Sequence, residues 1–221
     1  MGTDYEMEMT DMRKVFFSTV MMTLDNPGNR VVYQSRDFDM DGRNYFAPIS
    51  YLLDANIDEQ DDILIITTLT QTTNPENNYK ILKKEMKEIL EAHNAKATFV
   101  EIYEPDHTKQ RDEMDSLTFS RHFQEISDYF QDGDRIYADM TFGMKCNTIC
   151  SLIAMSYAAK AGKDVDVDCM VYAQYYRGDA ETSPTSDIID ITSLFYINTL
   201  VNNAKPGQKK NIDEFLRFMI G

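Results

Sequence analysis

The sequence predicts an α/β fold: a Rossmann-like open, mostly parallel sheet with helices on both faces. Strand-like and helix-like segments alternate about five times along the chain. Residues 62–68 form a near-continuous apolar run, which is typical of a parallel strand that is covered on both faces. Strands that alternate with helices form parallel sheets through right-handed crossovers, and we see no internal repeat that would favour another architecture.

The first half of the chain supplies two strands and two helices of this fold. Residues 14–22 are β-branched and aromatic and lead into a turn-rich stretch, which predicts a buried first strand. Residues 31–33 are a candidate short strand in the loop that follows. Residues 45–56 carry apolar side chains at helical spacing. The strand at residues 62–68 leads to a second helix, predicted over residues 75–93.

The second half continues the same alternation. Residues 97–102 predict a strand, and a helix is expected over residues 116–130. Residues 135–140 predict the next strand, and residues 146–160 form an apolar helix. Residues 165–175 alternate between apolar and polar side chains, which predicts a further strand.

The end of the chain divides the protein into two parts. Residues 188–191 predict a last short strand, and a helix with capping candidates follows over residues 193–204. A linker then leads to a short amphipathic helix over residues 212–220. We therefore expect one Rossmann-like domain over residues 13–204, and a linker with a short C-terminal helix over residues 205–221.

Composition limits the classes of function. The chain has 221 residues, 43% of them hydrophobic, so it can bury a core. Its 37 Asp and Glu against 22 Lys and Arg give a net charge of −15, which argues against a binder of long DNA or RNA. A small anion in a local basic pocket is still possible. The apolar runs are short and the start of the chain lacks signal-peptide features. Both observations predict a cytoplasmic protein that does not bind a membrane.

The metal-ligating residue types are few and scattered. No Cys or His pair has the spacing of a zinc site, so we expect no metal centre and no cofactor. We interpret the three cysteines as small core residues: Cys146, Cys150 and Cys169. The alternating carboxylates of Asp164, Asp166 and Asp168 predict a solvent-facing strand, with a magnesium site as the alternative.

The most informative segment joins the strand at residues 135–140 to the helix at residues 146–160. A loop with one glycine, Gly143, runs directly into the helix, and Lys145 stands at the junction. Free N–H groups and the helix dipole at such a junction favour an anion. The spacing fits neither a Walker A loop nor a dinucleotide fingerprint. A plain strand–helix turn with a solvated lysine is the alternative that spacing alone leaves open.

Four segments together resemble a CARF domain, the CRISPR-associated Rossmann fold of type III CRISPR systems. Residues 139–145 (DMTFGMK) are similar to that family's Asp-x-Thr-x-Gly-x-Lys/Arg signature. Met21 and Met22 stand where many members carry glycine. The resemblance covers about residues 13–204. The other segments are residues 15–21 (VFFSTVM) with 45–48 (YFAP), 63–68 (ILIITT), and 171–175 (VYAQY) with 189–192 (IDIT).

The resemblance implies a homodimer that binds a cyclic oligoadenylate across its two-fold axis, in antiviral signalling. A ring of four adenylates is the size that we prefer. Two copies of the loop that ends at Lys145 would meet the phosphates of one ring. The expected ligand-binding residues are Thr19, Met22, Thr23, Thr70, Gln71, Thr141, Phe142, Gly143, Met144, Lys145, Asn147, Gln174 and Tyr175.

Two readings of that resemblance remain open. As a sensor, the protein would pass the signal to an effector, and the chain shows no effector after residue 204. As a metal-independent ring nuclease, it would cleave the ring by attack of a ribose 2′-hydroxyl, with Lys145 and Ser18 as catalytic residues. A transcription regulator would need a basic winged-helix tail, and a dinucleotide oxidoreductase would need the glycine fingerprint; the sequence has neither.

Overall fold

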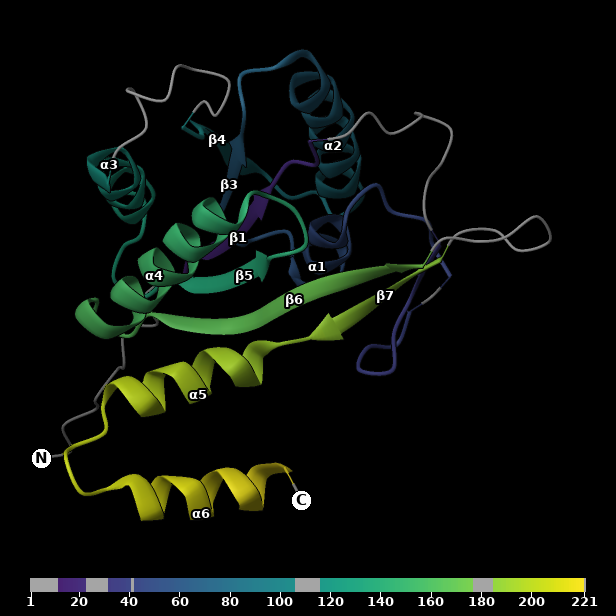
Figure 1. The fold of residues 1–221 in the computed structure, drawn as a ribbon. Helices are drawn as coiled ribbons and strands as arrows, with labels where there is room; N and C mark the ends of the chain where they lie inside the picture. The colour runs from purple at the N-terminus through teal and green to yellow at the C-terminus, as the bar shows by residue number, and fades with distance from the viewer. Residues whose placement is uncertain (1–11, 23–31, 41, 106–115, 177–184, 221) are drawn as a thin grey trace, which may run out of the picture.

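The computed structural model describes residues 12–22, 32–40, 42–105, 116–176 and 185–220. These residues form a seven-stranded sheet with the order β2-β7-β6-β5-β1-β3-β4 (Figure 1). β7 is antiparallel to β6, and every other neighbouring pair is parallel. The predicted Rossmann-like, mostly parallel sheet is therefore confirmed. The strands are β1 (Lys14–Thr19), β2 (Val32–Gln34), β3 (Ile63–Leu69), β4 (Ala97–Tyr103), β5 (Arg135–Asp139), β6 (Asp166–Tyr176) and β7 (Thr185–Asp190).

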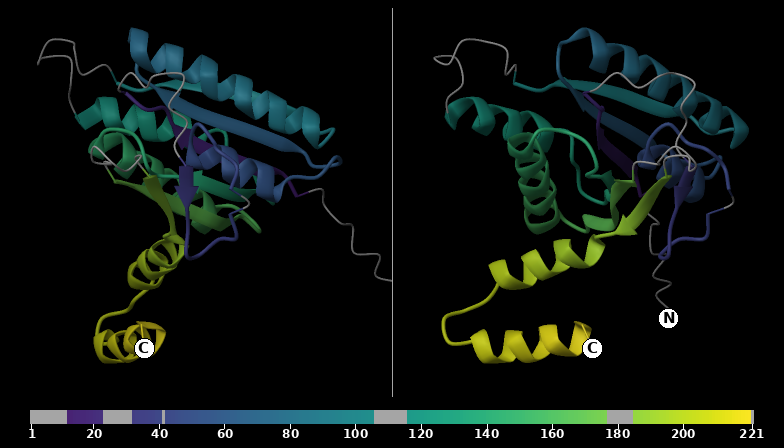
Figure 2. Two further views of the ribbon diagram at one scale, coloured as in Figure 1. Left: turned by 90° about the vertical axis from the view of Figure 1, so that its right-hand side faces the viewer. Right: turned by 45° about the vertical axis from the view of Figure 1, so that its right-hand side comes forward.

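Helices cover both faces of the sheet, as predicted (Figures 1 and 2). Side chains of β1 alternate between two separate hydrophobic clusters: Phe16 packs on one face, and Val15 and Phe17 on the other. The cluster around Phe16 includes residues of α1 (Pro48–Asn56) and α2 (Thr73–Ala92). The other cluster includes residues of the remaining three covering helices: α3 (Ser116–Ser127), α4 (Lys145–Ala161) and α5 (Thr192–Asn202).

Several element boundaries differ from the prediction for local reasons. β1 ends at Thr19, three residues before the predicted end. α1 begins at Pro48 because proline suits the first helical turn and Ala47 before it is extended. α2 begins at Thr73, ahead of Pro75, since proline is also tolerated in a first turn. α3 ends at Ser127, and the C-terminal helix α6 (Lys209–Ile220) starts earlier than expected.

The structure also tests two predictions about individual residues. Cys150 is buried and Cys169 is partly buried, but Cys146 is exposed on the first turn of α4, so its prediction as a core residue is wrong. The carboxylates of Asp166 and Asp168 are partly exposed, as expected of a solvent-facing strand. Both lie near the Arg135 guanidinium, at 3.4 and 3.7 Å, which gives them an ionic partner.

The last two helices extend the molecule beyond the sheet. α5 packs against β6, and α6 lies on the far side of α5, away from the sheet (Figures 1 and 2). Phe215 and Phe218 of α6 are largely exposed. Among the described residues, none of the helices combines the length and the apolar character needed to cross a bilayer.

Candidate functional site

Asp139 at the end of β5 anchors the loop that precedes α4. Its carboxylate accepts the backbone N–H of Thr141 at 2.9 Å and the N–H of Ile49, in the first turn of α1, at 3.3 Å. Burial raises the pKa of Asp139 to about 6, and the hydrogen bonds from Thr141 and Ile49 oppose this shift. This carboxylate therefore fixes the loop relative to α1 and is not itself open to a ligand.

The loop is also held against β6. The backbone N–H of Met140 donates to the carbonyl of Val171 at 2.9 Å. The N–H of Ala173 donates to the hydroxyl oxygen of Thr141, also at 2.9 Å, and that hydroxyl lies beside the Asp139 carboxyl as well. The Thr141 side chain is thus used within the protein, which leaves the backbone of the loop as the surface that a ligand would meet.

Gly143 brings the loop over the end of β1. Its φ is +110°, a conformation that L side chains rarely adopt. A Cβ at this position would lie 3.0 Å from Cγ2 of Thr19 and 3.4 Å from the hydroxyl of Thr148. Both the conformation and the space therefore require glycine here.

The first turn of α4 has no side-chain cap. Met144 is the N-cap residue, and its side chain makes no capping hydrogen bond. The first backbone bond of the helix runs from the N–H of Thr148 to the carbonyl of Met144 at 2.9 Å. The N–H groups of residues 145–147 precede that bond, so they have no acceptor within the helix.

Lys145 adds a full positive charge at this helix end. Its side chain is exposed and forms no ion pair with any described residue, whereas Lys14 and Lys83 each pair with a carboxylate at 2.8 Å. α4 contains no Asp or Glu, in a chain whose net charge is −15. The junction is therefore a local positive region on an acidic protein.

A row of polar side chains lies beneath this junction. The hydroxyls of Thr19 and Thr68 are 2.7 Å apart, and the Thr68 hydroxyl donates to the Glu104 carboxylate at 3.2 Å. Glu104 is only 4% exposed. Burial raises the pKa of Glu104, and the neighbouring amide of Asn147 and hydroxyl of Thr68 oppose the shift. Its signal in the sequence was a carboxylate directly after a parallel strand, which our sequence reasoning missed.

Four predicted site residues are buried: Ser18, Thr19, Thr70 and Asn147. Asn147 is fully buried; its amide lies near Glu104, yet neither amide atom makes a hydrogen bond of ordinary geometry with a described residue. The hydroxyls of Thr70 and Ser18 are also buried without such a partner. Ser18 follows the β1 alternation of Phe16, so it faces α1 and α2, while Thr19 faces the α4 side. The structure therefore does not bring Ser18 to the side of Lys145.

The other described residues of the prediction lie at or after the strand ends of this sheet edge, but the alternation of β6 turns Tyr175 to the α1 side, opposite to Gln174. Met22, Gln71, Gln174 and Tyr175 are exposed. Phe142 is partly buried and packs against the cluster on the α1 side, and Met144 is partly buried. Thr23 lies outside the described residues.

His122 of α3 is a second buried group that sequence reasoning missed. It is 3% exposed, and neither ring nitrogen has a hydrogen-bond partner among the described residues. Burial lowers the pKa of His122 to about 4, so the ring is neutral at pH 7. Nothing in the spacing of the three histidines marked this one.

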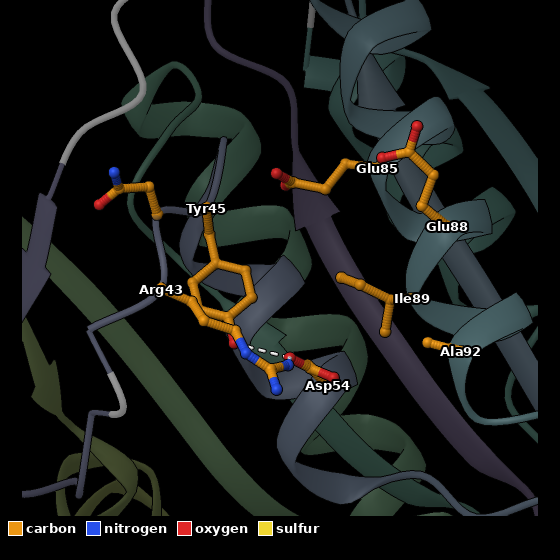
Figure 3. Close-up of a pocket in the computed structure, with 8 residues that line it drawn as sticks. Arg43, Tyr45, Asp54, Glu85, Glu88, Ile89 and Ala92 are labelled. Atoms are coloured by element: carbon orange, nitrogen blue, oxygen red, sulfur yellow. Dashed lines mark hydrogen bonds and ion pairs between the residues drawn. The ribbon is translucent and has the colours of Figure 1, made fainter.

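A separate pocket of 430 Å³ lies between α1 and α2 (Figure 3). Asp54 is one of its lining residues: the carboxylate pairs with Arg43 at 2.6 Å and accepts the Tyr45 hydroxyl at 2.7 Å, and His93 lies 2.8 Å from its other oxygen. Burial raises the pKa of Asp54, but these three contacts outweigh that effect and the net shift is downward. Asp54 is near the end of α1, whereas Asp139 contacts its first turn, so this pocket is distinct from the loop at Lys145.

Among the described residues, no group of three or more His, Cys, Asp or Glu side chains is placed to hold a metal ion. No protein-family model matches the chain, and no curated protein matches it. The function is therefore inferred from the geometry of the junction between β5 and α4.

Proposed function

We propose that this protein binds a cyclic oligoadenylate, with four adenylates as the preferred ring, as a CARF-like homodimer in type III CRISPR antiviral signalling. The observation that carries the proposal is the junction itself. A left-handed glycine, three N–H groups without an acceptor in the helix and Lys145, which has no ionic partner among the described residues, converge at one helix end. This arrangement suits a phosphate.

Side chains on the neighbouring strand support a nucleotide over a simple anion. Val171 and Ala173 of β6 point into the cluster on the α1 side, so Tyr172, Gln174 and Tyr176 point to the α4 side. All three are exposed. Tyrosine rings stack on bases, and an amide can pair with an adenine edge. Phosphate and base contacts are thus available on the same face of the sheet.

An apolar stripe on α4 supports the two-fold partner. Ile149, Ile153 and Tyr157 are spaced by one helical turn and are each more than half exposed. Exposed apolar patches on soluble proteins mark interaction sites, and depletion of charge is a feature of interface cores. A second copy across this stripe would place two Lys145 side chains around one symmetric ring.

Ring cleavage is the second candidate, and the buried row that leads from Glu104 to Thr19 favours it. In such a reaction the ribose 2′-oxygen attacks the adjacent phosphorus, the bond from phosphorus to the 5′-oxygen breaks, and a 2′,3′-cyclic phosphate forms. Lys145 would stabilise the developing negative charge. Thr19, not Ser18, is the hydroxyl on the side of Lys145, so it replaces Ser18 as the candidate that orients the ribose.

Labelled cyclic tetra- and hexa-adenylate in EDTA separate the two functions. Binding is measured on filters, and products are resolved by chromatography. Tight binding without products supports a sensor, and linear products that disappear in Lys145→Ala support a ring nuclease. Lys160→Ala, an exposed lysine at the other end of α4, is the matched control. Failure to bind either ring rules out both.

A further inference from the structure

The buried polar row of Thr19, Thr68 and Glu104 lies at the ends of three neighbouring strands. β1 pairs with β3, and β3 with β4, so that Thr19 lies opposite Thr68 and Thr68 opposite Ile102. Glu104 comes two residues after Ile102 and therefore points to the same face. The row Thr19–Thr68–Glu104 runs across the sheet directly beneath Gly143.

Glu104 is costly in this position. Its carboxylate has no cationic partner among the described residues, and one of its oxygens makes no hydrogen bond with them. A buried carboxyl without a full set of partners reduces stability. Packing alone therefore gives no reason for its presence, whereas its connection through Thr68 to Thr19 does.

The chemistry of the row fixes the direction of its hydrogen bonds. The Thr68 hydroxyl donates its single proton to the Glu104 carboxyl group. The Thr68 oxygen then accepts the proton of the Thr19 hydroxyl, 2.7 Å away. Thr19 is left with lone pairs alone, so it can accept a hydrogen bond but cannot donate one.

We propose that Glu104 and Thr68 are positioning residues, which make Thr19 an acceptor for the 2′-hydroxyl of a ribose next to the bound phosphate. The inference rests on the proposed function. Cγ2 of Thr19 is 3.0 Å from the position that a Gly143 Cβ would take, so Thr19 packs directly under the loop, and the proposal requires the ribose next to the bound phosphate to reach its hydroxyl. A phosphate oxygen, itself an acceptor, is disfavoured at Thr19. The row thereby distinguishes ribose from deoxyribose.

The test compares two ligands by calorimetry: cyclic tetra-adenylate and its fully 2′-deoxy counterpart. The wild-type protein should bind the ribose ring at least about tenfold more tightly, the worth of one good hydrogen bond. Thr68→Val, which keeps the shape but removes the hydroxyl, should abolish this preference. Thr68→Ser, which restores the hydroxyl, should recover it, and Glu104→Gln should weaken it. Thermal melting checks that each variant is folded.

If Thr68 and Glu104 had a purely structural role, their variants would not change the ratio of the affinities for the two rings. Equal binding of both rings by the wild-type protein overturns this inference and leaves the proposed function intact. Retention of the preference in Thr68→Val, or its loss in Thr68→Ser, also overturns it. Binding of neither ring by the wild-type protein overturns the proposed function and this inference together.

Discussion

The space that Gly143 leaves beside its Cα is filled by Thr19: a Cβ there would lie 3.0 Å from the threonine methyl carbon. The two residues are 124 positions apart in sequence, and they join the loop after β5 to the end of β1. The loop backbone that we propose as the phosphate site and the buried row of hydroxyls are thereby in contact. Ligand binding at the loop and the integrity of the sheet edge should depend on each other.

Gly143→Ala should abolish binding of cyclic tetra-adenylate and lower the free energy of unfolding by about 1–3 kcal/mol, because it combines backbone strain with a contact at Thr19. Calorimetric titration and thermal melting measure the two effects. Gly133→Ala is the control: Gly133 also has a positive φ, but a Cβ there meets nothing within 4 Å. Its variant should lose some stability and keep ligand binding. Equal binding by both variants would contradict this expectation.

Lys145→Ala should weaken binding of the ring at least about tenfold, since each ring would lose two positive charges. The free energy of unfolding should change by less than about 0.5 kcal/mol, because the side chain is exposed and has no ionic partner among the described residues. Titrations at two salt concentrations measure the charge contribution. A variant that binds as tightly as the wild-type protein at both would argue against a role for this lysine.

Ile153→Lys should weaken the dimer at least about tenfold, because it places a charge in the middle of the α4 stripe. Sedimentation velocity across a concentration series measures the monomer–dimer equilibrium. Leu117→Lys on α3 is the control, since Leu117 is 57% exposed and Ile153 is 51% exposed. A wild-type protein that stays monomeric with and without ligand would exclude this interface.

Asp139→Asn should change how stability depends on pH. The pKa of Asp139 rises from 3.8 to about 6 on folding, so between these values the folded state holds the proton more tightly. The contribution of Asp139 to the free energy of unfolding therefore falls as the pH rises through this range. Lowering the pH from 7 to 5 should raise the Tm of the wild-type protein relative to Asp139→Asn. A constant difference in Tm would show that the carboxyl does not titrate in this way.

His122→Leu should change the pH dependence with the opposite sign. The pKa of His122 falls from 6.5 to about 4 on folding, so the unfolded state takes up the proton first as the pH falls. The wild-type protein should lose on the order of 2 kcal/mol between pH 7 and pH 5 from this group alone. Urea unfolding at both pH values should show the variant gaining stability relative to the wild-type protein on acidification. If the variant shows no gain in stability relative to the wild-type protein, His122 is more solvated than the structure indicates.

Local patterns predicted the central strands well, because a parallel strand covered on both faces must be apolar along its length. β3 shows this most clearly, since all seven of its residues are buried. Local sequence patterns could not predict the order of the strands in the sheet. β2 pairs with β7 through Val32 and Thr185, and its neighbour is therefore set by folding of the whole chain. Helix starts were displaced by proline, which suits the first turn of α1 and of α2.

The sequence analysis predicted the junction between β5 and α4 but not the buried row beneath it. The sequence marks Gly143 and Lys145 because a glycine before a helix has a direct conformational meaning. Glu104 was missed although it directly follows β4, and His122 was not selected because the burial that lowers its pKa cannot be derived from spacing. Ser18 and Thr19 looked equivalent in sequence, and the alternation of β1 separates them onto opposite faces.

Isothermal titration of the wild-type protein with cyclic tetra-adenylate in EDTA tests the central claim most directly. We expect saturable binding with one ring for every two chains, weakened by salt and by Lys145→Ala. A flat titration, or a stoichiometry of one ring per chain that Lys145→Ala leaves unchanged, would contradict the account.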